Sequence, residues 1–121
     1  MKRGEIYWAN IAPRSGSEQQ GMRPVIILSH DGFNSVTAWR SMIVIPVSTS
    51  ERQAGRGPTA VALAAGEGGL AEASTALCHQ ITTLDKSKLT TRIGSLSDGA
   101  LARVEEGLCK AIGLELEIIE P

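Results

Sequence analysis

Two short runs of aliphatic residues, 25–28 and 42–47, constrain the fold of this chain more than any other feature. Both are rich in the β-branched residues that favour strands. The first run is apolar at successive positions, so both of its faces are expected to be covered. Residues 24–29 are therefore predicted to form a central strand, and residues 42–47 another strand. Pro46 has no N–H to donate, so its part of that strand is predicted to lie at an edge or a bulge.

Shorter segments of strand-forming composition surround these two runs. Residues 5–11 predict a strand that Pro13 ends, and residues 14–21 predict a loop. Residues 30–35 predict a turn, because Asp-Gly is a strong turn signal. The remaining predictions are the start of a strand at 37–39, strands at 59–63, 74–83 and 91–94, and a helical turn at 84–89.

Residues 97–113 carry the signals of one amphipathic helix. Ser97 is predicted as the N-cap and Gly113 as the C-terminal cap. Leu96 and Leu101 occupy the positions of a hydrophobic staple. Apolar residues then recur at helical spacing, namely Leu101, Val104, Leu108 and Ile112. Several short strands followed by a single helix predict a mainly β fold, in which a compact β-barrel-like sheet carries a C-terminal α-helix.

The length of 121 residues is expected to form a single domain over 1–121 with a modest core. Four aromatic residues leave that core mostly aliphatic, and Trp39 is predicted inside it in preference to an exposed stacking surface. No apolar run approaches the ~20 residues that a bilayer-spanning helix needs. The charged N-terminus lacks the features of a signal peptide, so we expect a cytoplasmic protein.

The two cysteines, Cys78 and Cys109, are expected to be small buried hydrophobic residues and not a disulfide. Their spacing from His30 and His79 matches no zinc-finger or ribbon pattern. We therefore expect neither a metal site nor a cofactor.

Charge is distributed unevenly along the chain, although the formal net charge is only −1. Residues 1–59 hold seven Lys/Arg and four acids, a net charge of +3, whereas residues 60–121 hold five and nine, a net charge of −4. The difference is consistent with one basic face, which is the side that a nucleic acid would approach.

The loop at 16–22 leads directly into Arg23 and Pro24. It carries one acid and two amides, which are Glu18, Gln19 and Gln20. A residue before proline is held in extended geometry. The Arg23 guanidinium is thus a restrained fork of donors that matches phosphate oxygens. The alternative is that Arg23 is an ion-pair partner at a strand edge and the loop only a hairpin connection.

A hydroxyl cluster and a dibasic, glycine-rich segment follow the strand predicted at 42–47. They contain Ser48, Thr49, Ser50, Arg52 and Arg56. The pattern is typical of a mobile loop beside a binding site. An ordinary solvated hairpin tip has the same composition.

Taken in order, five motifs resemble the MazF/PemK family of toxin endoribonucleases. They are residues 3–8, 16–19 with Gly21, 23–25, 45–49, and 78–81 with 84–85, and the predicted C-terminal helix follows them. The likeness extends from about residue 3 to residue 113. It implies an SH3-like barrel that forms a homodimer, is inhibited by a cognate MazE-like antitoxin, and cuts single-stranded RNA without a metal. In that reaction the ribose 2′-OH attacks the adjacent phosphorus and leaves a 2′,3′-cyclic phosphate and a 5′-OH.

The resemblance also implies roles for individual residues. Arg23 matches the catalytic arginine, Glu18 is the candidate proton acceptor or the group that orients Arg23, and Ser48 stands where relatives commonly have threonine. Successive strand residues face opposite ways, so only one of Ser48 and Thr49 can face the site, and we prefer Ser48. The other expected substrate contacts are Gln19, Gln20, Thr49, Arg52, Arg56, His79 and Gln80.

His79 departs from the family pattern. Some relatives have an acidic residue there and an arginine two residues earlier, where this chain has Leu77. Leu77, His79 and Ile81 are predicted to share one face of the strand at 74–83. His79 is then either a proton shuttle or a packed strand histidine.

A non-catalytic toxin that resembles CcdB and binds DNA gyrase is the alternative function on the same fold. In that reading Glu18, Arg23 and Ser48 have no function. That reading also asks for binding residues at the C-terminal end, where residues 113–121 offer no aromatic anchor. A barrel that only bridges partners in an assembly is a third possibility.

Overall fold

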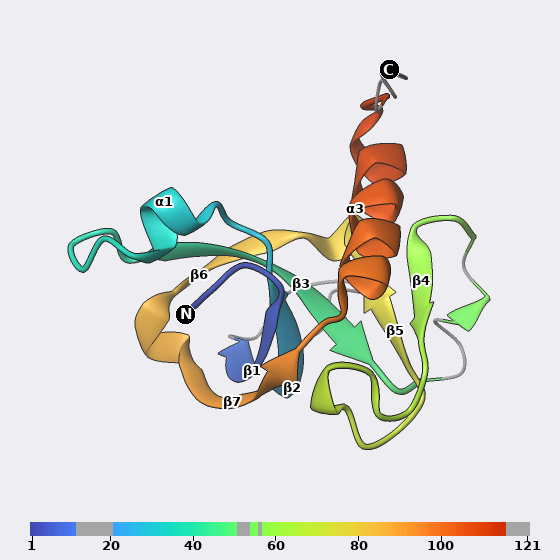
Figure 1. Ribbon diagram of the computed structural model, residues 1–121, viewed down its shortest axis with the longest axis horizontal. Coiled ribbons are helices and arrows are strands. Elements are labelled where there is room, and N and C mark those ends of the chain that lie inside the picture. Colours follow the sequence, from blue (N-terminus) through green and yellow to red (C-terminus); the bar gives the residue numbers. More distant parts are fainter. Residues whose placement is uncertain (12–20, 51–53, 56, 116–121) are drawn as a thin grey trace.

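The computed structural model describes residues 1–11, 21–50, 54–55 and 57–115. Seven antiparallel strands in these residues form one sheet, and one long helix follows them (Figure 1). The strands are β1 (Glu5–Ile11), β2 (Gly21–Ile27), β3 (Ser41–Ser48), β4 (Ala60–Leu63), β5 (Ser74–Leu77), β6 (Thr82–Asp85) and β7 (Leu89–Ser95). The predicted mainly β fold with a C-terminal helix is confirmed.

The strand order is β4-β5-β3-β2-β1-β7, and β6 pairs with β3. The short 3₁₀ turn η3 (Lys86–Lys88) joins β6 directly to β7. Because β7 pairs with β1 and β6 with β3, the strands β3, β2, β1, β7 and β6 follow one another around a common interior (Figure 1). This is a small barrel, and β2 lies at its centre between β1 and β3, as its sequence predicts.

Both faces are buried at Val25–Ile27 of β2 and at Val44–Ser48 of β3, and alternate residues enter two different cores. Val25 and Ile27 of β2 face the barrel interior, together with Met42 and Val44 of β3. On the opposite face, a second core joins these strands to β4, β5 and the C-terminal helix. Its members from β2 and β3 and the segment after β2 are Ile26, Leu28, Ile45 and Val47. Two-sided burial explains why these strands read as continuous apolar runs.

β3 changes its partner strand in its second half. On the side away from β2, residues Ser41 to Val44 pair with β6, whereas Val47 and Ser48 pair with β5. Pro46 lies in the two-residue gap between these ladders, and its missing N–H therefore costs no ladder bond on that side. The chain crosses this gap in the 3₁₀ turn η2 (Cys78–Gln80), which separates β5 from β6.

The prediction of one continuous strand over 74–83 is therefore wrong. The shared face predicted for Leu77, His79 and Ile81 does not exist, because η2 interrupts the alternation of side chains. The strand start at 37–39 is also wrong. Those residues lie in turns after the short helix α1 (Asp31–Asn34), which forms where a turn was predicted.

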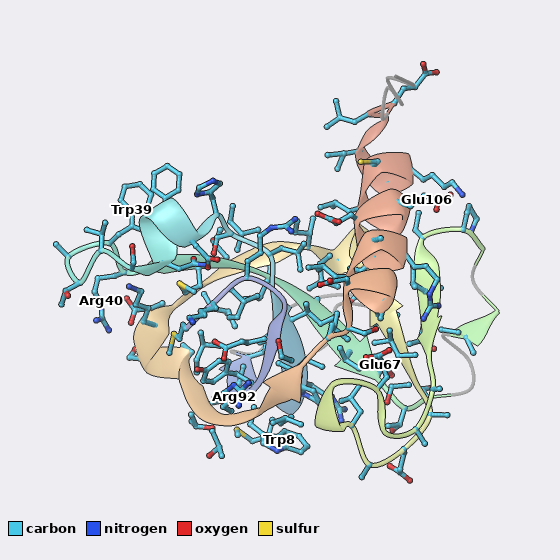
Figure 2. All side chains as sticks on the ribbon, viewed as in Figure 1. Trp8, Trp39, Arg40, Glu67, Arg92 and Glu106 are labelled. Carbon is cyan, nitrogen blue, oxygen red and sulfur yellow. The ribbon has the colours of Figure 1, made fainter. Side chains whose placement is uncertain are left out.

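Trp39 is not a core residue. Its exposed fraction is 47%, and its ring lies 5.0 Å from that of Phe33, centroid to centroid. Figure 2 shows Trp39 beside α1 on the outer surface, at the far end of the molecule from the C-terminal helix. The two cores are filled by aliphatic side chains without the Trp39 ring, and the ring therefore lies on the surface.

The C-terminal helix α3 (Asp98–Ile112) forms as predicted. The Ser97 hydroxyl accepts a hydrogen bond from the Ala100 N–H at 3.2 Å, and Gly113 ends the helix with φ of 74°. Glu67 adds a second cap, because its carboxylate accepts bonds from both the backbone N–H and the hydroxyl of Ser97. These two bonds hold the pKa of Glu67 below its ordinary value.

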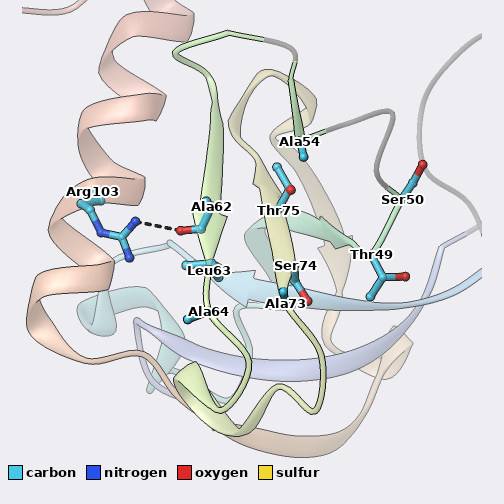
Figure 3. Close-up of a pocket in the computed structure, with 10 residues that line it drawn as sticks. All are labelled: Thr49, Ser50, Ala54, Ala62, Leu63, Ala64, Ala73, Ser74, Thr75 and Arg103. Carbon is cyan, nitrogen blue, oxygen red and sulfur yellow. Dashed lines mark hydrogen bonds between the residues drawn. The ribbon is translucent and has the colours of Figure 1, made fainter.

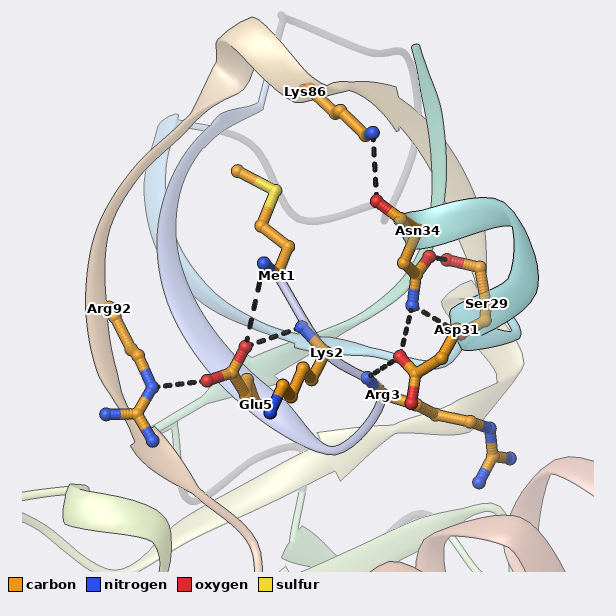
Figure 4. Close-up of polar contacts among 9 residues, drawn as sticks. All are labelled: Met1, Lys2, Arg3, Glu5, Ser29, Asp31, Asn34, Lys86 and Arg92. Atoms are coloured by element: carbon orange, nitrogen blue, oxygen red, sulfur yellow. Dashed lines mark hydrogen bonds and ion pairs between the residues drawn. The ribbon is translucent and has the colours of Figure 1, made fainter. Parts of the chain in front are cut away.

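A polar network ties the N-terminus to α1 and α3 (Figure 4). The Arg3 backbone N–H donates to Asp31 at 2.8 Å, and the Arg3 side chain donates to the Leu28 carbonyl at 2.9 Å. Its guanidinium also pairs with Glu105 of α3 at 2.7 Å. Asn34 donates to the Asp31 carboxylate, which completes the link to α1.

Both cysteines are free. Cys78 is fully buried in the core beneath α3, as predicted, and burial raises the pKa of its thiol to about 11. Cys109 is only partly buried. In the described part of the chain, no helix has the length and apolar character needed to span a membrane.

One close backbone approach yields a test of the fold. A Cβ atom on Gly94 of β7 would lie 2.1 Å from the Gly68 carbonyl oxygen, whereas a Cβ on Gly99 of α3 meets nothing within 4 Å. We expect Gly94→Ala to lower the free energy of unfolding by about 3 kcal/mol, because backbone must move. Gly99→Ala should raise it by about 0.5 kcal/mol, through helix propensity. Urea denaturation measures both values, and equal stability of the two variants would contradict the approach of Gly68 to β7.

Candidate functional site

Arg23 lies near the start of β2, where that strand passes β1 on one side and the end of β3 on the other. Arg23 pairs with Ala9 of β1 and is exposed. The ladder between β2 and β3 pairs Val25 with Pro46. Arg23 lies two residues before Val25 and Ser48 two residues after Pro46, so alternation gives both side chains the face of that pair. Residues opposite one another on antiparallel strands point to the same face. The fold therefore directs the guanidinium and this hydroxyl to one side of the sheet.

Ser48 is the last residue of β3 and pairs with Thr75 of β5. It is only 6% exposed, and its oxygen accepts a hydrogen bond from the Ser50 N–H at 3.1 Å. Because a hydroxyl both accepts and donates, its proton is still available to a ligand oxygen. Thr49, the next residue, is exposed. The two residues predicted as alternatives thus differ in burial, and only the hydroxyl of Ser48 is both buried and fixed by a backbone hydrogen bond.

Two clefts lie at this end of the sheet. The smaller, of about 230 Å³, is the Trp8 cleft, which is lined by Trp8, Pro24, Thr49, Gly69, Leu70, Ala71, Glu72, Ser74 and Ile93. The larger, of about 560 Å³, is the Arg103 cleft, which is lined by Thr49, Ser50, Ala54, Ala62, Leu63, Ala64, Ala73, Ser74, Thr75 and Arg103 (Figure 3). Thr49 and Ser74 line both, so the two clefts meet beside the end of β3.

Trp8 is a site residue that the sequence reasoning did not select. It is 41% exposed (Figure 2), pairs with Pro24 across β1 and β2, and lines a cleft on the face of the sheet opposite to that of Arg23. An exposed indole is a surface on which a base can stack. Alternation along the predicted strand at 5–11 sets Trp8 on the same face as Ile6. The sequence does not show that this face is open at Trp8, so the residue was not selected.

His79 and Gln80 lie in η2, on the side of β3 that faces away from β2. The strand β3 thus separates them from Arg23. The structure brings Arg23, Ser48 and Thr49 to one end of the sheet and sets His79 and Gln80 beside the middle of β3. His79 is exposed. The reading of His79 as a packed strand histidine is therefore wrong.

Five further candidates lie outside the described residues, namely Glu18, Gln19, Gln20, Arg52 and Arg56. Their roles stay predictions. Within the described residues, no cluster of three or more His, Cys, Asp or Glu side chains could hold a metal ion.

The chemistry that this arrangement offers is recognition of an oxyanion. A guanidinium presents several donors in a plane, and a nearby hydroxyl adds one more from a buried position. Hydrogen bonds of this kind are strongest when the acceptor is charged, as a phosphate oxygen is.

The chain matches the model of a known protein family over residues 2–112. That family is described as the PemK-like, MazF-like toxin of type II toxin-antitoxin systems. This chain belongs to it.

Relatives of known name agree with this assignment. The chain is 36% identical over 116 residues to endoribonuclease EndoA of Bacillus subtilis, and the alignment covers 94% of this chain and 96% of the relative. It is 32% identical over 114 residues to endoribonuclease MazF of Staphylococcus saprophyticus, and that alignment covers 94% of this chain and 92% of the relative. Both relatives are thus matched over nearly their whole length.

Solved structures of the family share the fold. The crystal structure of MazF from Deinococcus radiodurans superposes with a TM-score of 0.77 at 29% identity and covers 94% of this chain and 97% of that one. A MazE–MazF structure from the same organism gives a TM-score of 0.71 at 28% identity and covers 95% and 97%. The predicted MazF/PemK-type barrel is confirmed.

The exposure of Arg23 generates a test that separates function from stability. Among the described residues, no side chain bonds to the Arg23 guanidinium, whereas Arg3 bonds to the Leu28 carbonyl and to Glu105. We expect Arg23→Ala to change the free energy of unfolding by less than about 0.5 kcal/mol. Arg3→Ala should lower it by about 1–2 kcal/mol, because a part-buried carbonyl loses its donor. Thermal and urea unfolding measure both, and a large loss in Arg23→Ala would favour the ion-pair role.

Proposed function

We propose that this protein is the toxin of a type II toxin–antitoxin system and a metal-independent endoribonuclease that cleaves single-stranded RNA. The observation that supports this most strongly is the β2–β3 register, which gives Arg23 and Ser48 the same face of the sheet at the end where β3 stops. Family membership supports the same conclusion, since the relatives from B. subtilis and S. saprophyticus are named endoribonucleases.

The reaction is an intramolecular transesterification. The 2′ oxygen of one ribose attacks the adjacent phosphorus while the bond from phosphorus to the 5′ oxygen of the next nucleotide breaks. A base takes the proton of the 2′-OH, and the departing 5′ oxygen gains a proton. The products are a 2′,3′-cyclic phosphate and a free 5′-OH, so no water is consumed in this step.

Arg23 and Ser48 act on the charge that builds up on the phosphorus centre. The non-bridging oxygens gain negative charge as the 2′ oxygen attacks, and the Arg23 guanidinium neutralises it through one or two N–H bonds. The Ser48 hydroxyl donates to the same group from the end of β3. Ser48 is positioned for this by its burial and by the bond that it accepts from Ser50.

Glu18 is the proposed base, or else the group that orients Arg23. An ordinary glutamate carboxylate is ionised near neutral pH and able to accept a proton. Along the RNA we assign substrate contacts to Gln19, Gln20, Thr49, Arg52, Arg56, His79 and Gln80. His79 is assigned to substrate binding and not to proton transfer, because β3 separates it from Arg23.

The proposed assembly is a homodimer of single-domain chains in the cytoplasm, inhibited by a cognate MazE-like antitoxin. The MazE–MazF structures from D. radiodurans support the existence of such a partner. We expect the antitoxin to bring an acidic, disordered tail that folds on binding and competes with RNA for the basic groove.

Incubation of the purified protein with a mixed-sequence RNA in EDTA tests the proposal. We expect cleavage without added metal and products that end in a 2′,3′-cyclic phosphate. Arg23→Ala should lower the cleavage rate by about 10²–10³, as removal of one oxyanion donor does. Arg40→Ala is the matched control, because Arg40 is an exposed arginine paired with Asp85 elsewhere on the surface. Intact RNA together with arrested DNA gyrase would instead indicate a CcdB-like poison.

The two hydroxyls give a second test. Ser48→Ala removes the buried donor and should slow turnover about ten-fold, the value of one hydrogen bond to a charged oxygen. Thr49→Ala should have the smaller effect, because Thr49 lines the clefts but is exposed. Single-turnover kinetics on the same RNA decide the ranking, and the reverse order would assign the catalytic hydroxyl to Thr49.

A further inference from the structure

The Arg103 cleft is the larger of the two clefts beside the end of β3, and the proposed reaction does not use it. It runs over the β4–β5 hairpin, from Arg103 of α3 to Thr49 and Ser50 beyond the end of β3 (Figure 3). Its volume of about 560 Å³ lies within the range of pockets that hold small ligands. A single nucleotide fits a space of this size.

The lining has a distinctive chemistry. Four of the ten lining residues are alanines, which form a shallow apolar floor, and four carry hydroxyls. The hydroxyl residues are Thr49, Ser50, Ser74 and Thr75. Only one lining residue is charged, and that residue is Arg103. A surface of this kind offers hydrogen-bond donors and one positive charge, with no carboxylate in the lining to repel an anion.

Thr75 supplies an independent sign of a missing ligand. It is only 4% exposed and lines the cleft. Its hydroxyl has no hydrogen-bond partner among the described residues, whereas the neighbouring Ser74 hydroxyl donates to the Glu72 carbonyl at 2.8 Å. A buried hydroxyl without a partner is costly. A ligand oxygen in the cleft would satisfy it.

Arg103 is held in place at the other end of the cleft. Its Nη1 donates to the Ala62 carbonyl at 2.7 Å, which fixes the plane of the guanidinium beside the outer edge of β4 (Figure 3). A guanidinium has five N–H donors, so the remaining ones can bind another acceptor. Glu67, an acid whose pKa Arg103 helps to lower, is bonded through its carboxylate to Ser97 and does not line the cleft.

The cleft lies beside the proposed site of cleavage. Thr49 and Ser74 line both the Arg103 cleft and the Trp8 cleft, which contains Pro24 beside Arg23. Ser48 itself pairs with Thr75 of β5, which lines the Arg103 cleft, so a nucleotide next to a phosphate at Ser48 lies beside this cleft.

We propose that the Arg103 cleft binds a nucleotide flanking the cleaved phosphate, with that nucleotide's phosphate on Arg103 and its sugar and base over the alanine floor. This inference rests on the proposed RNA-cleaving function. RNA fits better than an acidic peptide, because the floor offers no deep apolar pocket for a peptide side chain, whereas the hydroxyls match the polar edge of a nucleotide. Arg103 is thus a substrate-binding residue and not a catalytic one.

Binding of an uncleavable RNA tests the inference apart from catalysis. The probe is a fluorescent, mixed-sequence oligonucleotide in which 2′-fluoro replaces every 2′-OH, so it cannot be cleaved. Its length of about 12 nucleotides lies within the range that single-strand-binding proteins cover. Arg103→Gln should weaken binding about ten-fold and reduce the slope of log K against log[salt] by about 0.7, the value of one phosphate contact. Lys110→Gln is the matched control, since it removes one charge from the same helix but does not line the cleft.

Thr75→Val separates the hydroxyl from the charge. Valine keeps the shape of the buried side chain, so the variant is expected to fold. It should weaken binding a few-fold while leaving the salt slope unchanged, because no ionic contact is lost. Thermal unfolding of each variant identifies any loss that comes from the fold.

The outcomes distinguish the two proposals. A wild-type protein that neither binds nor cuts RNA overturns the proposed function. A wild-type protein that does both, with Arg103→Gln no weaker than Lys110→Gln, overturns the flanking subsite alone. Weakened binding of a glutamate-rich peptide by Arg103→Gln, with RNA binding unchanged, would assign the cleft to an acidic peptide and also overturn it. In cleavage assays the subsite predicts a raised KM and an unchanged kcat.

Discussion

The pairing of β2 with β3 is the constraint on which the rest of this structure depends. Where Val25–Ile27 of β2 runs beside Val44–Val47 of β3, both faces are buried, so alternate side chains build the barrel interior and the core beneath α3 at once. A shift of one residue in their register would exchange the two cores. The same register gives Arg23 and Ser48 the face of the Val25–Pro46 pair, close to where β3 ends. Stability of the fold and geometry of the candidate site therefore come from one ladder.

Pro46 lies in the part of β3 where this strand changes its partner on the side away from β2. β3 changes its partner from β6 to β5 across Ile45 and Pro46, where a missing N–H breaks no ladder on that side, and the chain crosses the gap in η2. The change of partner brings the β4–β5 hairpin to the end of β3, where both clefts form. The wider Arg103 cleft exists only because this hairpin and α3 lie against each other, with Arg103 bonded to the Ala62 carbonyl.

Much of the fold was predictable because its signals are local. Burial on both faces marks 24–29 as a central strand, and the cap residues Ser97 and Gly113 bound α3 as predicted. The errors occur where tertiary contacts override local preference. The run at 74–83 has strand composition throughout, yet it breaks where β3 changes partner. Trp39 is the kind of residue that usually enters a core, yet the aliphatic core closes without it.

The sequence by itself determined the family and the identity of the candidate groups, because motifs such as the arginine before Pro24 and the hydroxyls after Val47 are properties of the chain order. It also determined the mainly β class. Only the tertiary structure decided which of these groups meet. Arg23 and Ser48 share a face through a ladder between distant segments, Trp8 of β1 lines a cleft with Thr49, and Arg103 joins a cleft with residues about 40 positions away. Such proximities depend on the register and packing of whole strands, which no short stretch of residues encodes.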